Sequence, residues 1–312
     1  MTPDGRDPED SRFTPGATVA QNTEMSEEAQ KANPSSSPNS NQSSNQSSSD
    51  RQAEPVTETA PLIFEQPLNE RMRTFLRLDF LYNQALYHNE MQSQWGSRAA
   101  MGSLLDILAI AARGDVRADV QKELERHLAQ LNVFQSKPGV DSARLRTVMS
   151  NLLRLRADLV ACGSNYLASL KDSEFLSAIK HRSAIPGGTC EFDLPDFFFW
   201  LNQATDQRAR SFNEWLATLR PLCDAIAELL WITRQHGKPR QEIARAGVYH
   251  ITFERDTPIQ LVRIALPAAS GLYPETSGSH YRCSVRLLAW NGLNQRPQQT
   301  PDDVPFTLTC CT

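Results

Sequence analysis

The chain has 312 residues, a formal net charge of −4 and 40% hydrophobic residues, which is enough for one large or two small folded domains. Residues 1–60 contain no Leu, Ile, Trp, Tyr or Cys, and they hold ten acidic against four basic residues. Such a segment buries too little apolar surface to offset about 1–2 kcal/mol of backbone entropy per ordered residue. We therefore predict that residues 1–61 form a disordered, acidic tail rich in Ser, Asn and Gln.

Without this tail the chain carries a charge of about +2, a balance that neither indicates nor excludes binding to nucleic acid. No run of 18 apolar residues and no apolar N-terminal signal segment are present, so we expect a cytoplasmic protein that does not cross a membrane. The six cysteines form no CxxC pair and have no Cys/His ligand spacing, so we expect reduced thiols and neither a metal nor a cofactor.

Helical spacing of apolar residues follows a short apolar run at 62–66, which we predict to be a strand. Asn69 is a typical N-cap, and the apolar residues from Met72 to Leu86 recur every three or four positions after it. Comparable stripes predict four more helices that form a mostly antiparallel bundle, namely over 97–113, after Asp115, after Asp141 and over 165–181.

The residues Pro186, Gly187 and Gly188 form a turn signal that ends this helical pattern. Apolar and acidic residues then alternate over 189–194, which predicts a strand that joins the β-domain. Helical spacing resumes over 195–235, and we expect breaks near 205–206 and at Pro221.

From Gly237 onward the composition changes to short β-branched or alternating runs between Pro, Gly, Asn and Ser clusters. The runs predict an antiparallel sheet with strands at 248–253, 259–266, 280–288 and 306–310. The predicted fold class is α+β: a mainly helical domain over 62–236, then a smaller, sandwich-like antiparallel β-domain over 237–312, with 62–66 and 189–194 joining it.

Enzymatic motifs are missing from the sequence: it has no Gly-rich phosphate loop, HExxH, GxSxG or paired-carboxylate motif. We therefore predict that the protein is not an enzyme and has no catalytic residues. A Cys-His pair built from Cys190 or Cys283 with His181 or His280 stays open as a minor alternative, because such pairs form in space and not in sequence.

Arginine is enriched near the C-terminus, where residues 234–290 hold eight bases, seven of them Arg, against four acids. Arg282, Ser284 and Arg286 alternate with Cys283, Val285 and Leu287, so a strand here presents both arginines on one face. Arginine binds carboxylates through a planar fork, although the spacing fits a solvated face equally well. Aromatic residues nearby favour a binding site for an acidic and partly apolar ligand: Tyr249, Tyr273, Tyr281 and Trp290.

Several collinear segments between residues 62 and 312 resemble the ZapD family of bacterial cell division factors. They are FEQPLNERMRTFLRLDFL (64–81), GDVRADVQKELERH (114–127), PGVD (138–141), IPGGTCEFDLPDFFFWL (185–201), LYPETSGSHYRCSVRLL (272–288) and the pair Cys310-Cys311. The resemblance implies a non-enzymatic cytoplasmic homodimer at midcell that binds the C-terminal tail of the tubulin-like protein FtsZ and crosslinks its filaments. The first 60 residues lie outside the family pattern. We expect them to be inert; the alternatives are that they tether a further partner or shield the basic surface through their charge of −6.

The resemblance places the FtsZ-tail site on a basic surface of the β-domain and assigns it Arg282 and Arg286. Arg182 and Arg240 are matched only by their positions next to family segments. We include Arg263, His280 and Tyr249 in the predicted FtsZ-binding set. The alternative is a nucleic-acid-binding protein that uses the same basic and aromatic surface, although with FtsZ as the partner no nucleic acid is expected.

Overall fold

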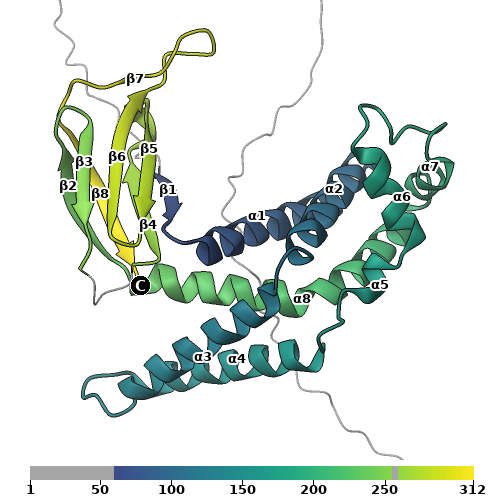
Figure 1. Cartoon of the computed structure of the whole chain (residues 1–312), viewed down its shortest axis with the longest axis horizontal. Helices are drawn as coiled ribbons and strands as arrows, with labels where there is room; N and C mark the ends of the chain where they lie inside the picture. The colour runs from purple at the N-terminus through teal and green to yellow at the C-terminus, as the bar shows by residue number, and fades with distance from the viewer. Residues whose placement is uncertain (1–59, 255–258) are drawn as a thin grey trace, which may run out of the picture. The chain divides into compact units, whose positions relative to one another are not determined.

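The computed structural model describes residues 60–254 and 259–312, so the predicted tail lies outside the described residues except for 60 and 61. Among the described residues, strand β1 comes first, the helices follow, and the other strands come last (Figure 1). The helices are α1 (Glu70–Glu90), α2 (Gln94–Ala111), α3 (Val116–Phe134), α4 (Ser142–Ala161), α5 (Ala168–Lys171), α6 (Glu174–Ser183), α7 (Pro195–Leu201) and α8 (Thr205–His236).

The helix starts follow the predicted capping residues. Asn69 accepts a hydrogen bond from the backbone N–H of Met72 at 2.8 Å, and Asp115 and Asp141 cap α3 and α4 in the same way. The second helix begins earlier than predicted, because Ser93 caps it through the N–H of Gly96. Local side-chain chemistry thus decides where these helices begin.

Two helix predictions were wrong. The segment 165–181 holds two helices, α5 and α6, because Ser173 ends the first and caps the second through the N–H of Leu176. Helix α8 continues through Pro221, although a proline removes one backbone hydrogen bond. Leu219, Leu222 and Cys223 are almost fully buried around that position, so packing of the apolar face holds the helix together.

The strand predicted at 189–194 is also wrong, because this segment forms consecutive turns. Gly187 adopts a positive φ of 74°, and its carbonyl accepts the N–H of Cys190. The carbonyl of Cys190 then accepts the N–H groups of Asp193 and Leu194, which leads directly into α7. Local hydrogen bonds therefore take the place of a strand partner.

The strands form two antiparallel sheets. The first sheet has the order β1-β4-β8-β2, and the second has the order β3-β6-β5 with the short β7 beside β6. Strands β2 and β5 were not predicted, because both contain Pro and Arg or Gly in place of an apolar run. The bounds are β1 (Leu62–Pro67), β2 (Lys238–Ala244), β3 (Val248–Thr252), β4 (Leu261–Leu266), β5 (Leu272–Ser279), β6 (Arg282–Ala289), β7 (Gln298–Gln299) and β8 (Val304–Cys311).

Buried apolar residues form two clusters, one among the helices and one between the two sheets. The helical cluster extends to Leu261 and Cys311 of the first sheet, which are fully buried. Strand β1 pairs with β4, so the N-terminal strand belongs to the sheets, as predicted. The fold class α+β is confirmed.

A buried ionic group joins α1 and α3 to the residue that precedes β4. Glu123 of α3 is 1% exposed and contacts Arg71 of α1 at 3.0 Å, Arg126 at 2.6 Å and the Gln260 amide at 3.0 Å. Burial alone raises the pKa of the Glu123 carboxyl, but these hydrogen bonds and charges outweigh it, so the pKa is lowered. The carboxylate thus stays ionised where helices and sheet meet.

Candidate functional site

Strand β6 alternates between buried and exposed side chains, as its sequence predicted. Cys283, Val285 and Leu287 are at most 2% exposed and belong to the core between the sheets, whereas Arg282 and Arg286 are exposed. The two arginines are four residues apart, which corresponds to about 13 Å along a strand. They can therefore contact two separate carboxylates of one extended ligand.

The register fixes which side chains share this face with the arginines. Directly paired residues of antiparallel strands point to the same side, so the neighbours of Arg282, Ser284 and Arg286 follow from the pairing. We call this surface the β6 face, and its members on β3 and β5 are Val248, His250, Thr252, Glu275, Ser277 and Ser279.

Arg286 is held in place by its neighbours on the β6 face. Its Nη1 lies 3.0 Å from Oε2 of Glu275, and its Nε donates to Oε1 of Gln299 at 3.3 Å. Both partners are solvent-exposed, so the ion pair is weak and a ligand carboxylate can replace Glu275. Sequence reasoning missed Glu275 because Pro and Gly residues hid strand β5, and it missed Gln299 because the two-residue strand β7 has no strand pattern.

Aromatic residues border the β6 face at its ends. Tyr281, in the turn between β5 and β6, is 62% exposed, and Trp290, just after β6, is 58% exposed. Tyr273 pairs with Leu288 and is half-buried on the same side as Arg286. His280 is exposed in the turn beside Tyr281. The face therefore combines charge with apolar contact area, as the predicted ligand requires.

Tyr249 does not lie on the β6 face. It pairs with the buried Val285, and its ring packs edge-on against Phe306 with 5.3 Å between centroids. Burial and the Glu242 carboxylate raise the pKa of its hydroxyl. Arg240, on the sheet-edge strand β2, forms an ion pair with the same Glu242 at 2.9 Å. Tyr249 and Arg240 thus belong together, at an edge between the two sheets and apart from Arg282 and Arg286.

Arg263 is placed on the first sheet, where its Nε lies 3.0 Å from Oε1 of Glu65 on the neighbouring strand β1. Arg234 of α8 contacts the same carboxylate at 2.8 Å. Arg263 therefore belongs to an ion-pair group between the first sheet and α8. The prediction had grouped it with Arg282 and Arg286.

Arg182 lies in the last turn of α6 and pairs with Asp193 at 3.2 Å. The structure therefore brings together only Arg282, Arg286 and the nearby His280 from the predicted set.

The cysteines considered as nucleophiles are not paired with histidine. Burial raises the pKa of Cys283 to about 11, which keeps the thiol protonated. The Sγ of Cys190 donates to Oδ2 of Asp193 at 3.7 Å and not to an imidazole. Among the described residues, no three His, Cys, Asp or Glu side chains group as a metal site would require.

An aromatic cluster is exposed where α2 begins and the 189–194 turns lead into α7. Trp95 is 77% exposed, Phe192 82%, Phe199 69% and Phe198 43%. Arg98 bridges the cluster, since its guanidinium lies 5.6 Å from the Trp95 ring centroid and donates to the carbonyl of Thr189. We call Trp95, Phe192, Phe198 and Phe199 the aromatic end. Exposed aromatic patches of this kind mark interaction surfaces.

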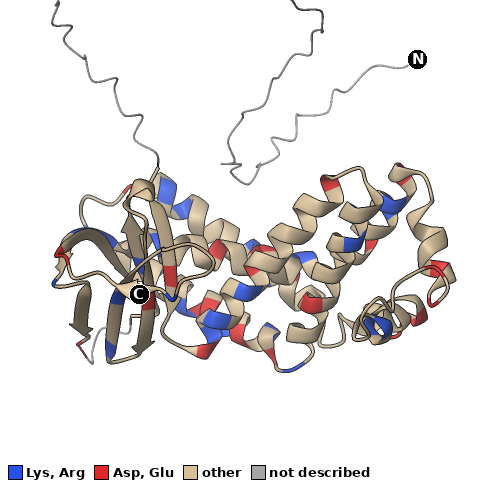
Figure 2. Ribbon diagram, turned by 90° about the horizontal axis from the view of Figure 1, so that it is seen from above, with Lys and Arg blue, Asp and Glu red and all other residues tan. Residues whose placement is uncertain are grey.

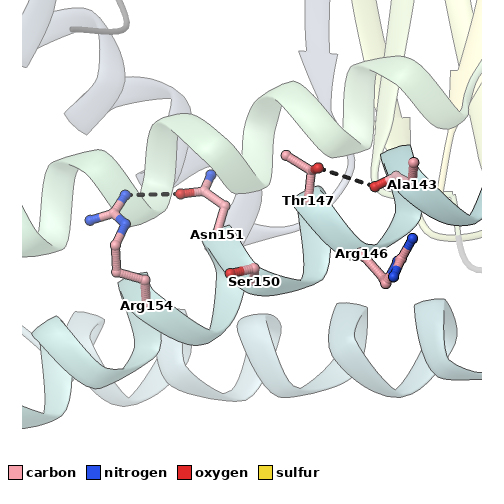
Figure 3. A pocket seen from close by; sticks show the side chains of 6 residues that line it. All are labelled: Ala143, Arg146, Thr147, Ser150, Asn151 and Arg154. Carbon is pink, nitrogen blue, oxygen red and sulfur yellow. Dashed lines mark hydrogen bonds between the residues drawn. The ribbon is translucent and has the colours of Figure 1, made fainter. Parts of the chain in front are cut away.

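A polar recess of about 670 Å³ lies along the outer side of α4. Its walls include Arg146 and Arg154; Arg154 donates to Asn151, and Thr147 donates to the carbonyl of Ala143 (Figure 3). None of the predicted site residues lines it. Basic and acidic residues are interspersed over the helices (Figure 2), so this recess is not part of a uniformly basic helical surface.

Together these features define an α+β protein with an exposed, arginine-bearing sheet face. None of the described helices has the length and apolar character that a membrane span needs. The sequence model of ZapD, described as a cell division protein, matches residues 76–286. The chain therefore belongs to the ZapD family of cell division proteins.

Relatives of known name agree with this assignment. The chain is 36% identical over 251 residues to cell division protein ZapD of Methylococcus capsulatus, covering 80% of this chain and 98% of the relative. It is 33% identical to that of Janthinobacterium sp., with 80% and 99% covered, and 34% identical to that of Yersinia pseudotuberculosis, with 81% and 98% covered. About a fifth of this chain thus has no counterpart in relatives that are matched almost completely.

Proposed function

We propose that this protein is a non-enzymatic division factor that binds the acidic C-terminal tail of FtsZ through the β6 face. The observation that carries the proposal is the alternation of β6, which exposes Arg282 and Arg286 above a fully buried set of apolar residues. Membership in a family of cell division proteins supports a divisome partner. The arginines bind carboxylates of the tail, and Tyr273, Tyr281 and Trp290 hold its apolar side chains.

We further propose that the protein works as a homodimer in the cytoplasm at midcell. Two β6 faces per dimer can engage tails of two filaments, so binding that is on the order of micromolar per site gains avidity along a filament. The aromatic end offers the apolar surface on which a second copy docks. Crosslinking of filaments into bundles follows from this bivalency.

Co-sedimentation with polymerised FtsZ tests the proposal. We expect the wild-type protein to pellet bundles and the double variant Arg282→Glu with Arg286→Glu to lose at least about tenfold in binding, since each arginine contributes a charge-assisted contact. A matched control is Arg113→Glu with Arg210→Glu, which makes the same change of charge at two exposed positions, one just after α2 and one in α8. Equal bundling by the β6 variant and the control would refute the site.

A gel-shift titration with DNA and RNA addresses the alternative function. Tight binding of nucleic acid together with no effect on FtsZ sedimentation would favour the nucleic-acid alternative and reject FtsZ as the partner.

A further inference from the structure

A small apolar pocket lies where residues of α3, α4 and α8 meet; Figure 1 shows these three helices beside one another. Its volume is about 230 Å³, and its most buried walls are Leu131, Leu145 and Ile232, which are at most 8% exposed. Trp231 and Val140 also line it and are 42% and 37% exposed, so the cavity opens to solvent between apolar side chains. We call it the three-helix pocket. None of its lining residues belongs to the β6 face or to the aromatic end.

The size of the three-helix pocket limits what it can hold. An apolar cavity of about 150 Å³ takes up benzene, whereas pockets for whole small-molecule ligands have about 300–1,000 Å³. A volume of about 230 Å³ lies between these values and therefore suits one ring with the carbon atom that links it to a chain. Aromatic side chains that enter such pockets are the main anchors of many protein interfaces. The cavity thus fits an aromatic side chain of another protein better than a metabolite.

One charged group at the rim has no counter-charge in the described part of the chain. The exposed Arg144 forms no ion pair there, whereas Arg154 and Arg156 of the same helix each pair with an acid. Asp141 is the other charged group at the rim, and its Oδ1 accepts the backbone N–H groups of Ala143 and Arg144 at 3.0 Å each. Asp141 is therefore engaged as the N-cap of α4, and the guanidinium of Arg144 can bind a carboxylate of a ligand.

The end of α8 adds two polar groups to the rim, His236 and Gln235. Nδ1 of His236 lies 2.8 Å from the carbonyl oxygen of Ile232, and the ring stacks on the buried His127 with 6.1 Å between the ring centroids. These contacts fix the imidazole, and a neutral histidine whose Nδ1 donates to a carbonyl keeps Nε2 as an acceptor. A peptide backbone at the rim can therefore donate an N–H group to His236.

We propose that the three-helix pocket binds an aromatic side chain of a partner protein, and that Arg144 binds a carboxylate one or two residues away from it in the partner's sequence. The ring fills the apolar cavity, and the carboxylate supplies the charge that the fold does not give to Arg144. This interaction goes beyond the proposed binding of FtsZ, because it uses none of the residues of the β6 face. It gives the helical part of the protein an attachment point of its own.

Fluorine NMR of the full-length protein labelled with 5-fluorotryptophan tests the location. The chain has five tryptophans, among which Trp231 lines the pocket, Trp290 borders the β6 face and Trp95 belongs to the aromatic end. The probe is the capped peptide acetyl-Gly-Trp-Glu-Gly-amide, for which we expect an affinity on the order of millimolar. It should shift the resonance of Trp231, assigned with Trp231→Phe, and leave those of Trp290 and Trp95 in place. A shift of Trp290 or Trp95 without one of Trp231, or no shift at about ten times that concentration, would overturn the proposal.

The same titration tests both parts of the recognition. Replacing the Trp of the peptide by Ala should weaken binding at least about tenfold, because the buried ring is lost. Replacing its Glu by Gln should weaken binding to the wild type about twofold to fivefold, whereas Arg144→Gln should bind both peptides equally. Arg146→Gln is the matched control, since Arg146 lines the separate recess on α4 and should leave the preference for Glu unchanged. A preference for Glu that survives in Arg144→Gln would reject the role of Arg144.

Co-sedimentation with FtsZ separates this proposal from the proposed function. Arg144→Gln should pellet FtsZ bundles like the wild type, and Arg282→Glu with Arg286→Glu should still show the peptide-induced shift of Trp231. Loss of that shift in the β6 variant would show that the peptide binds the β6 face and would overturn the proposal.

Discussion

Arg234 of α8 and Glu65 of β1 form a two-pronged ion pair, with Nε 2.9 Å from Oε1 and Nη2 2.8 Å from Oε2. Arg263 of β4 contacts Oε1 of the same carboxylate at 3.0 Å. The first sheet is thereby tied to the last turn of the longest helix. The Glu65 carboxylate thus contacts two arginines that are each about three-quarters buried, and Asp79 lies 3.8 Å from Arg234 as a second, more distant partner.

Substitution Glu65→Gln should lower the free energy of unfolding by about 2 kcal/mol, because it leaves the largely buried Arg263 without its ion-pair partner and leaves Arg234 with only the more distant carboxylate of Asp79 at 3.8 Å. Urea denaturation measures this loss. Glu125→Gln is the matched control, since Glu125 pairs with an exposed Arg156 and should change stability by less than about 0.5 kcal/mol. Equal losses in both variants would contradict a stabilising role of Glu65.

Substitution Glu275→Gln should strengthen binding of the FtsZ-tail peptide by about twofold to fivefold at low salt. The change releases Arg286 from its ion pair and removes a negative charge from the β6 face. Anisotropy titrations of the wild type and the variant measure the ratio. Weaker binding by the variant would show that Glu275 positions Arg286 and does not compete with the ligand.

Binding of the FtsZ tail should also weaken as salt rises, because exposed charges on the β6 face are screened over about 8–10 Å at physiological ionic strength. We expect the affinity to fall at least about tenfold between 50 and 500 mM salt, whereas a contact through Tyr281 and Trp290 alone would be nearly unaffected. An affinity that is constant over this range would reject an arginine-based site.

The double variant Phe192→Ser with Phe199→Ser should shift the protein from dimer to monomer in sedimentation velocity experiments. Both rings are mostly exposed at the aromatic end, so their loss removes apolar contact area without opening the core. Leu153→Ser is the control, since Leu153 is 52% exposed on α4. A dimer that survives the double variant and dissociates in the control would place the interface elsewhere.

Stability should fall as the pH is lowered below 6.5, in part through His127. Burial, followed by the charge of Arg126, lowers its pKa to about 4. Between pH 6.5 and about 4, the unfolded chain binds a proton at His127 that the native state does not bind. The free energy of unfolding therefore decreases in this range by up to about 1.4 kcal/mol per pH unit.

The variant His127→Gln should remove this part of the pH dependence, and His250→Gln, at an exposed position, should not. Urea denaturation at pH 7.5 and pH 5 provides the comparison. The same slope in wild type and His127→Gln would show that the imidazole is not held neutral in the native state.

Local interactions that can be recognised in the sequence determined where several helices begin and which side chains of β6 are exposed. Asn69, Asp115 and Asp141 fixed helix starts because an N-cap acts on N–H groups two or three residues away. The period of two in β6 predicted the exposed arginines, since successive side chains of a strand point to opposite sides. Family segments along the chain supplied the rest of the prediction.

Tertiary structure decided which of the predicted site residues meet. Tyr249 points into the core because its register partner is Val285, and Arg263 is committed to Glu65 and the helix α8. Helix α8 continues through Pro221 because its apolar face is packed in the core. The segment 189–194 forms turns because its backbone hydrogen-bond partners lie within the same short stretch of chain. Pairing register and burial are relations between segments, so neither the spacing nor the composition of one segment contains them.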